Sequence, residues 1–117
     1  MDEVEELVAE LAAIPGIEEV AAADETGTYV AGHQNEKPEE FAAILAFVGR
    51  SGNTLGYLMG TDSLESNRVS GKKHRLFVAV VGDYTVGVRV ALDAVAGLTH
   101  RKIKSAITKF EYALEEV

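Results

Sequence analysis

The residues of this chain best suited to catalysis are its lysines, arginines and histidines, and their spacing forms no catalytic motif. A phosphate-binding loop needs Gly-x-x-x-x-Gly-Lys-Ser/Thr, because backbone N–H groups hold the phosphates while the lysine and hydroxyl reach phosphate and Mg²⁺. Gly71-Lys72-Lys73 comes nearest, but Ser66 replaces the first glycine and Lys73 replaces the hydroxyl residue. We therefore predict that the chain has no phosphate-binding loop.

The remaining ionisable residues also lack a catalytic or metal-binding arrangement. His33, His74 and His100 occur singly, without paired-ligand spacing, so we interpret them as surface residues. Glu18 and Glu19 are adjacent on a predicted strand, where neighbouring side chains point to opposite faces and do not converge. We therefore expect a protein that is not an enzyme and that needs no cofactor or metal.

The composition is that of a folded globular domain. The chain has 117 residues, 47% of them apolar, so we expect a single domain over residues 1–117. Cysteine is absent, which excludes a disulfide framework and thiol catalysis and suits a reducing cytoplasm. Because no apolar run approaches about 20 residues, we expect no membrane insertion.

Charge is unevenly distributed along the chain. The net charge of −8 argues against binding to nucleic acid or anionic membranes. Residues 1–40 hold twelve acids and one base, whereas residues 68–109 hold nine bases and two acids. This dipolar pattern favours protein–protein recognition, although solvated faces remain the simpler alternative for any one charge. The candidate partner surface consists of Lys72, Lys73, Arg75, Arg101 and Lys102.

The hydrophobic pattern predicts three helices and five strands. Apolar residues at Val4, Leu7, Val8 and Leu11 have helical spacing, and alternation over 85–92 indicates a half-buried strand. The predicted helices are 2–13, 38–58 and 99–116, and the predicted strands are 17–24, 28–32, 63–70, 76–81 and 85–92, with turns at 24–27 and 71–74. The order α-β-β-α-β-β-β-α predicts an α+β fold, a five-stranded antiparallel sheet with helices packed on its faces.

The helix over 38–58 carries two stripes. We expect the larger side chains to face the core, namely Phe41, Ile44, Leu45, Val48, Leu55 and Met59, with Gly52 among them. A row of small residues permits close approach of a second helix, and it predicts a dimer interface at Ala42, Ala46, Gly49, Asn53 and Gly56. The alternative is that these small residues fit beneath a loop or against the sheet.

The strand over 63–70 is polar and is expected at the sheet edge. An edge strand can pair with its symmetry mate and so satisfy its open hydrogen-bonding groups. This places Leu64, Ser66 and Arg68 in the same predicted dimer interface.

Several short segments resemble the roadblock / dynein light chain domain family over nearly the whole chain. They are the first helix leading into Ile14-Pro15-Gly16-Ile17, the hairpin from Asp24 to Gly27, the block of the second helix and third strand, and the run from Leu76 to Gly82. The resemblance implies a profilin-like sandwich that dimerises through the second helix and third strand. It also implies a non-catalytic platform, often a regulator of Ras-like small GTPases in prokaryotes.

Three functions follow as hypotheses. The first is a cytoplasmic homodimeric adaptor that binds a small GTPase and modulates its nucleotide state or localisation. The second is a structural scaffold subunit of a larger complex, as in dynein light chains. The third is a small-ligand sensor, which needs a polar pocket that the apolar strands at 76–81 and 86–92 do not supply.

Overall fold

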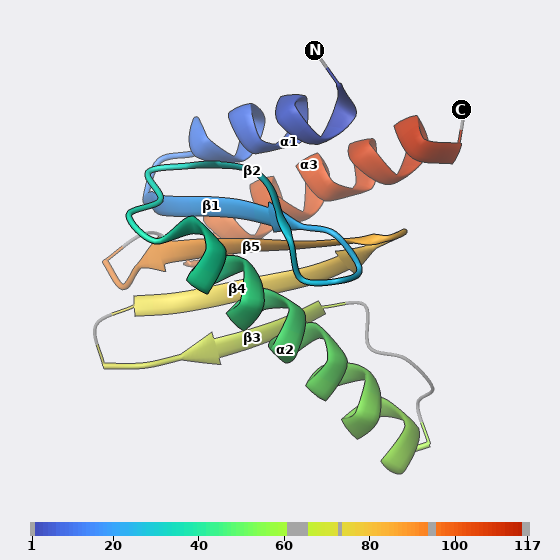
Figure 1. The fold of residues 1–117 in the computed structure, drawn as a ribbon. Helices are drawn as coiled ribbons and strands as arrows, with labels where there is room; N and C mark the ends of the chain where they lie inside the picture. The colour runs from blue at the N-terminus through green and yellow to red at the C-terminus, as the bar shows by residue number, and fades with distance from the viewer. Residues whose placement is uncertain (1, 61–65, 73, 94–95, 116–117) are drawn as a thin grey trace.

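In the computed structural model of the chain, the described residues are 2–60, 66–72, 74–93 and 96–115 (Figure 1). They form three helices and five strands in the order α-β-β-α-β-β-β-α. The elements are α1 (Glu3–Ala12), β1 (Ile17–Ala23), β2 (Tyr29–His33), α2 (Pro38–Leu58), β3 (Ser66–Ser70), β4 (His74–Val81), β5 (Tyr84–Ala91) and α3 (Ala96–Glu115).

The strands form one antiparallel sheet whose spatial order is β2-β1-β5-β4-β3 (Figure 1). The two edge strands, β2 and β3, have five residues each, and the inner strands have seven or eight. Strands β1 and β5 pair at the centre although they are far apart in the sequence, with Val20 opposite Val88 and Ala22 opposite Val86.

The predicted sheet needs correction in its strand bounds and in the arrangement of its strands. The pattern along the chain predicted no spatial order, because the central pairing of β1 with β5 depends on contacts between distant segments. The third strand was expected over 63–70, whereas β3 is Ser66–Ser70 and 63–65 lie outside the described residues. The turn predicted at 71–74 ends one residue earlier: Gly71 N donates to His74 O at 2.9 Å, and His74 already pairs with Ala91.

Local signals explain where the helices begin. The Asp2 side chain accepts a hydrogen bond from Glu5 N at 2.9 Å, so Asp2 is the N-cap of α1 rather than its first residue. Helix α2 begins at Pro38 as predicted. Helix α3 begins at Ala96, three residues before the predicted start at Thr99, because Thr99 is a buried residue of the helix rather than its cap.

The hairpin turn between β1 and β2 is confirmed. Gly27 has φ +85° and its N–H donates to Asp24 O at 3.0 Å. The Asp24 carboxylate accepts hydrogen bonds from the Thr26 hydroxyl and from the backbone N–H groups of Thr26 and Thr28. These bonds hold the pKa of Asp24 below its ordinary value.

Helices cover the sheet unequally on its two faces: α1 and α3 lie on one face and α2 lies alone on the other (Figure 1). Between the sheet and the α1–α3 pair lies the main core, which includes Leu11, Val20, Phe77, Val88 and Ile103. The core beneath α2 is thin, with Ala21, Leu45 and Val78 fully buried. Helix α2 is therefore attached through few large side chains.

Small residues let α2 approach the sheet closely. A Cβ on Gly49 would lie 3.2 Å from Val80 Cγ2 and 3.5 Å from Thr85 Cγ2. From the opposite side, a Cβ on Gly87 in β5 would overlap the side chain of Leu45, the largest fully buried residue of α2. Glycines on both elements thus set the spacing between helix and sheet.

The predicted core stripe of α2 is therefore wrong in part. Leu45 is buried as expected, but Ile44, Leu55 and Met59 are exposed. A helix held this close to β-branched strand residues has no room for large side chains on its inner side, so the small residues face inward and most large ones face solvent.

We predict that Gly87→Ala destabilises the fold by about 1–3 kcal/mol, because Leu45 must move within a packed core. The measurement is urea unfolding followed by circular dichroism. Gly97→Ala is the matched control, since a Cβ there meets nothing within 4 Å. Equal midpoints for the two variants would show that the approach of α2 is not tight.

Candidate functional site

The outer face of α2 is an exposed apolar surface. Ile44, Phe47, Leu55 and Leu58 fall within about 80° of one another around the helix, and we call these four residues the outer apolar face. Phe47 is 65% exposed and Leu58 is 79% exposed. Tyr57 and Met59 extend the exposed apolar surface at the end of the helix.

The open edge of the sheet lies beside this helix. Helix α2 contacts β3, and its last turns run past that strand (Figure 1). Among the described residues β3 pairs only with β4, so its other edge carries unpaired backbone groups. An apolar helix face beside an open strand edge is a surface typical of protein–protein contact.

The structure buries most of the predicted small-residue stripe inside the protomer. Four of its members are buried, and of these Ala46 lies against the turn at Gly27 and Gly49 against the sheet, which agrees with the alternative reading of that stripe. These four are Ala42, Ala46, Gly49 and Gly56, and Asn53 is half-buried. The glycines at 49, 52 and 56 mark the side of α2 that faces the sheet. Their spacing in the sequence could therefore have located the outer apolar face on the other side of the helix.

The predicted residues of the third strand are only partly described. Leu64 lies outside the described residues, and Ser66 begins β3 opposite Ala79. Arg68 lies at the middle of β3 opposite Phe77, with its side chain exposed on the face of the sheet that carries α3. Their place in a dimer interface stays a prediction.

The predicted basic partner surface is divided in the structure. Arg75 lines a pocket on the α3 face, whereas Lys102 lines a separate hollow that Ile14 and Leu98 also line. Lys72 and Arg101 are exposed, and Lys73 lies outside the described residues.

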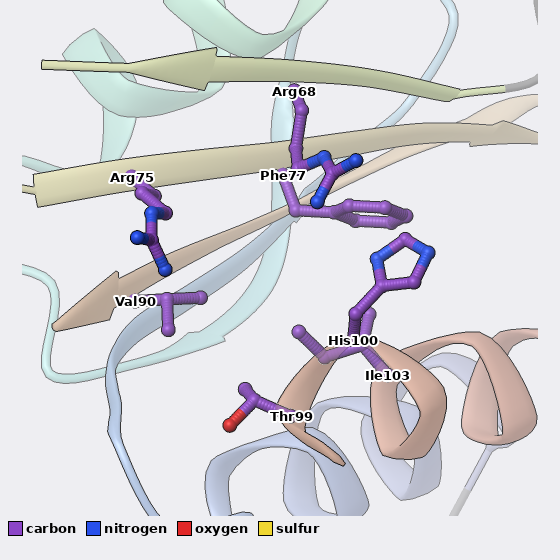
Figure 2. Close-up of a pocket in the computed structure, with 7 residues that line it drawn as sticks. All are labelled: Arg68, Arg75, Phe77, Val90, Thr99, His100 and Ile103. Carbon is purple, nitrogen blue, oxygen red and sulfur yellow. The ribbon is translucent and has the colours of Figure 1, made fainter. Parts of the chain in front are cut away.

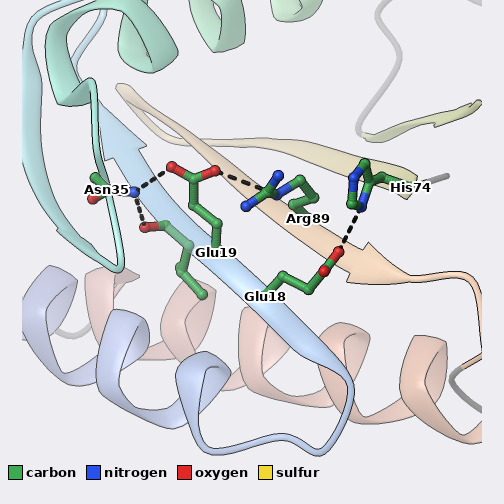
Figure 3. Close-up of polar contacts among 6 residues, drawn as sticks. Glu18, Glu19, Asn35, His74 and Arg89 are labelled. Atoms are coloured by element: carbon green, nitrogen blue, oxygen red, sulfur yellow. Dashed lines mark hydrogen bonds and ion pairs between the residues drawn. The ribbon is translucent and has the colours of Figure 1, made fainter.

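A polar row crosses the sheet near the beginning of β1 (Figure 3). The Glu19 carboxylate accepts a hydrogen bond from Asn35 Nδ2 at 2.9 Å and lies 3.4 Å from Arg89 Nε. Glu18 Oε1 lies 2.8 Å from His74 Nδ1. The two carboxylates have separate partners and do not converge on one site, since Glu18 pairs with His74 on β4 and Glu19 with Arg89 on β5. The register of β1 against β5 shifts between Ile17 and Glu19.

A small pocket of about 30 Å³ lies between the β3–β4 edge and α3 (Figure 2). The His100 ring packs edge-on against Phe77, with ring centres 5.4 Å apart, so the prediction of a surface histidine is wrong for His100. Burial lowers the pKa of His100 below 6.5, and the positive charges of Arg68 and Lys104 lower it further.

The comparisons with known proteins place the chain in a family. Residues 3–88 match the model of the Roadblock/LC7 domain. The chain belongs to the Roadblock/LC7 domain family. No curated protein matches the sequence.

Solved structures share the fold of this Roadblock/LC7 protein. Myxococcus xanthus MglB has a TM-score of 0.87 and 19% identity, covering 97% of this chain and 89% of that one. The gliding protein MglB from Thermus thermophilus has a TM-score of 0.83 and 16% identity, covering 98% and 90%. A Roadblock/LC7 domain from Streptomyces avermitilis has a TM-score of 0.82 and 16% identity, covering 95% and 97%.

Neither a metal site nor a membrane-spanning helix is found in the part of the chain that the structure describes. No three His, Asp or Glu residues there are grouped to hold a metal ion. None of the helices within the described ranges is long and apolar enough to cross a membrane.

We predict that His100 makes stability depend on pH. Its folded pKa lies below 6.5, so the unfolded chain binds more protons and stability falls as pH drops below about 6.5. His100→Gln removes this contribution and flattens the curve of unfolding free energy between pH 7 and 5. An unaltered slope in His100→Gln would contradict the prediction.

Proposed function

We propose that this protein forms a homodimer through the outer apolar face of α2 and the open edge of β3, and that the dimer binds a Ras-like small GTPase and modulates its nucleotide state or localisation. The observation that carries the proposal is the exposure of four large apolar residues on α2 beside an unpaired strand edge. The absence of cysteine suits the reducing cytoplasm, where we place this activity.

The exposed surface supports a self-complementary contact. Burial of a large apolar side chain contributes about 1.5–3 kcal/mol, and a twofold axis uses every such residue twice. Phe47 and Leu58 are among the most exposed apolar residues that the structure describes. Pairing of two β3 strands would satisfy backbone groups that are open in one protomer.

The resemblance to other family members supports the choice of partner. Three of the similar structures are of MglB, one of them described as a gliding protein and another as having a tetrameric arrangement. A dimer that binds one nucleotide state of a GTPase more tightly shifts the switch equilibrium by its differential affinity, so it needs no catalytic residue of its own.

We predict that Phe47→Asp converts the dimer into a monomer. The wild type should have a solution mass near 25 kDa, twice the 12.5 kDa of one chain. Loss of Phe47 burial should weaken the dimer on the order of a thousandfold or more, because about 2–3 kcal/mol is lost from each of the two copies. Light scattering after size exclusion measures this mass as a function of concentration.

Tyr112→Asp is the matched control, because Tyr112 on α3 is also 65% exposed but lies on the other face of the sheet. It should remain dimeric. A wild-type monomer, or equal weakening by both substitutions, would contradict the proposed interface.

A binding experiment tests the proposed partner: the dimer is mixed with a small GTPase from the same genome, loaded with GDP or with a GTP analogue. Preferential capture of one form, lost in Phe47→Asp, is the expected result. A dimer that captures both forms equally supports the scaffold hypothesis instead. Capture of neither form would overturn the choice of partner.

A further inference from the structure

Two arginines on the α3 face of the sheet, Arg68 and Arg75, form no ion pair with any acid that the structure describes, although acids outnumber bases by 19 to 11 in this chain. Within the described residues, no hydrogen bond or ion pair is made by the side chain of Arg68 or Arg75. The ion pairs that are present use Lys37, His74, Arg89 and Lys109. Among the described residues, these two positive charges therefore lie on one face of the sheet without a compensating acid.

The sheet register directs both arginines into one pocket. Arg68 lies opposite Phe77 and Arg75 opposite Val90, and directly paired residues project to the same face. Both line the pocket of about 30 Å³ with Phe77, Val90 and Ile103 as its apolar wall (Figure 2). This volume holds one or two water-sized groups, so it admits a single small polar group rather than a nucleotide.

The charged side chains that line the pocket, Arg68 and Arg75, are both positive. His100 shares the pocket with both arginines, and Lys104 follows one turn later on α3. His100 also lies near the beginning of α3, where the helix dipole favours negative charge. An anion in the pocket would therefore be attracted by the two arginines and by this end of the helix.

We propose that Arg68 and Arg75 bind a single phosphate-type oxyanion in this pocket, with the His100 ring beside it. Two guanidinium groups on neighbouring strands offer several charge-assisted donors to a doubly charged, tetrahedral group. The site does not depend on the proposed dimer: edge pairing of β3 uses backbone groups, and the Arg68 side chain stays on the α3 face. The oxyanion comes either from free phosphate or from a phosphorylated side chain of a protein.

The test is a titration of the full chain with inorganic phosphate at constant ionic strength, followed by NMR of the arginine side chains and the His100 ring. Saturable binding is expected, with His100 becoming easier to protonate as phosphate enters. Arg75→Gln and Arg68→Gln should each weaken binding about tenfold or more, since each removes a charge-assisted hydrogen bond. Arg101→Gln, an exposed cation outside the pocket, is the matched control and should change affinity less than about twofold.

A second titration with a short phosphoserine peptide distinguishes the two sources. Tighter binding of the peptide than of phosphate indicates a phosphorylated protein, and equal affinity indicates free phosphate. The proposal is overturned if neither probe saturates, or if Arg101→Gln weakens binding as much as Arg75→Gln. Either of those results leaves the dimer and GTPase measurements unaffected, because they use no phosphate site on this chain.

Discussion

The distance between α2 and the sheet is the constraint on which the rest of the structure depends. Gly49 on the helix and Gly87 on β5 remove the side chains that would hold the two layers apart. Once the helix is this close, its inner side accepts small residues and Leu45, so large apolar residues such as Phe47 and Leu58 face solvent. The packing that stabilises one protomer thereby creates the exposed outer apolar face of α2.

The opposite face of the sheet has a different chemistry. There α1 and α3 supply a thick apolar core. The acidic first third and the basic last third of the chain meet in the fold through Glu18–His74, Glu19–Arg89 and Glu10–Lys109. Among the described residues, Arg68 and Arg75 take no part in this pairing.

Local sequence signals predicted much of the fold, because caps, turns and apolar periodicity act over a few residues. Asp24 to Gly27 and the start of α2 at Pro38 are examples. The sequence did not predict the β1–β5 pairing or which side of α2 faces the sheet, since both depend on contacts between distant residues.

The most direct test of the account is chemical crosslinking across the outer apolar face, which is simple because the chain has no cysteine of its own. Ser51 lies between Phe47 and Leu55 on this side of α2, so Ser51→Cys with a reagent spanning the about 8–10 Å between packed helices should give a covalent dimer. Tyr112→Cys on α3 should not. Equal crosslinking at the two positions would contradict the claim that close packing of α2 on the sheet presents its outer face to a second copy.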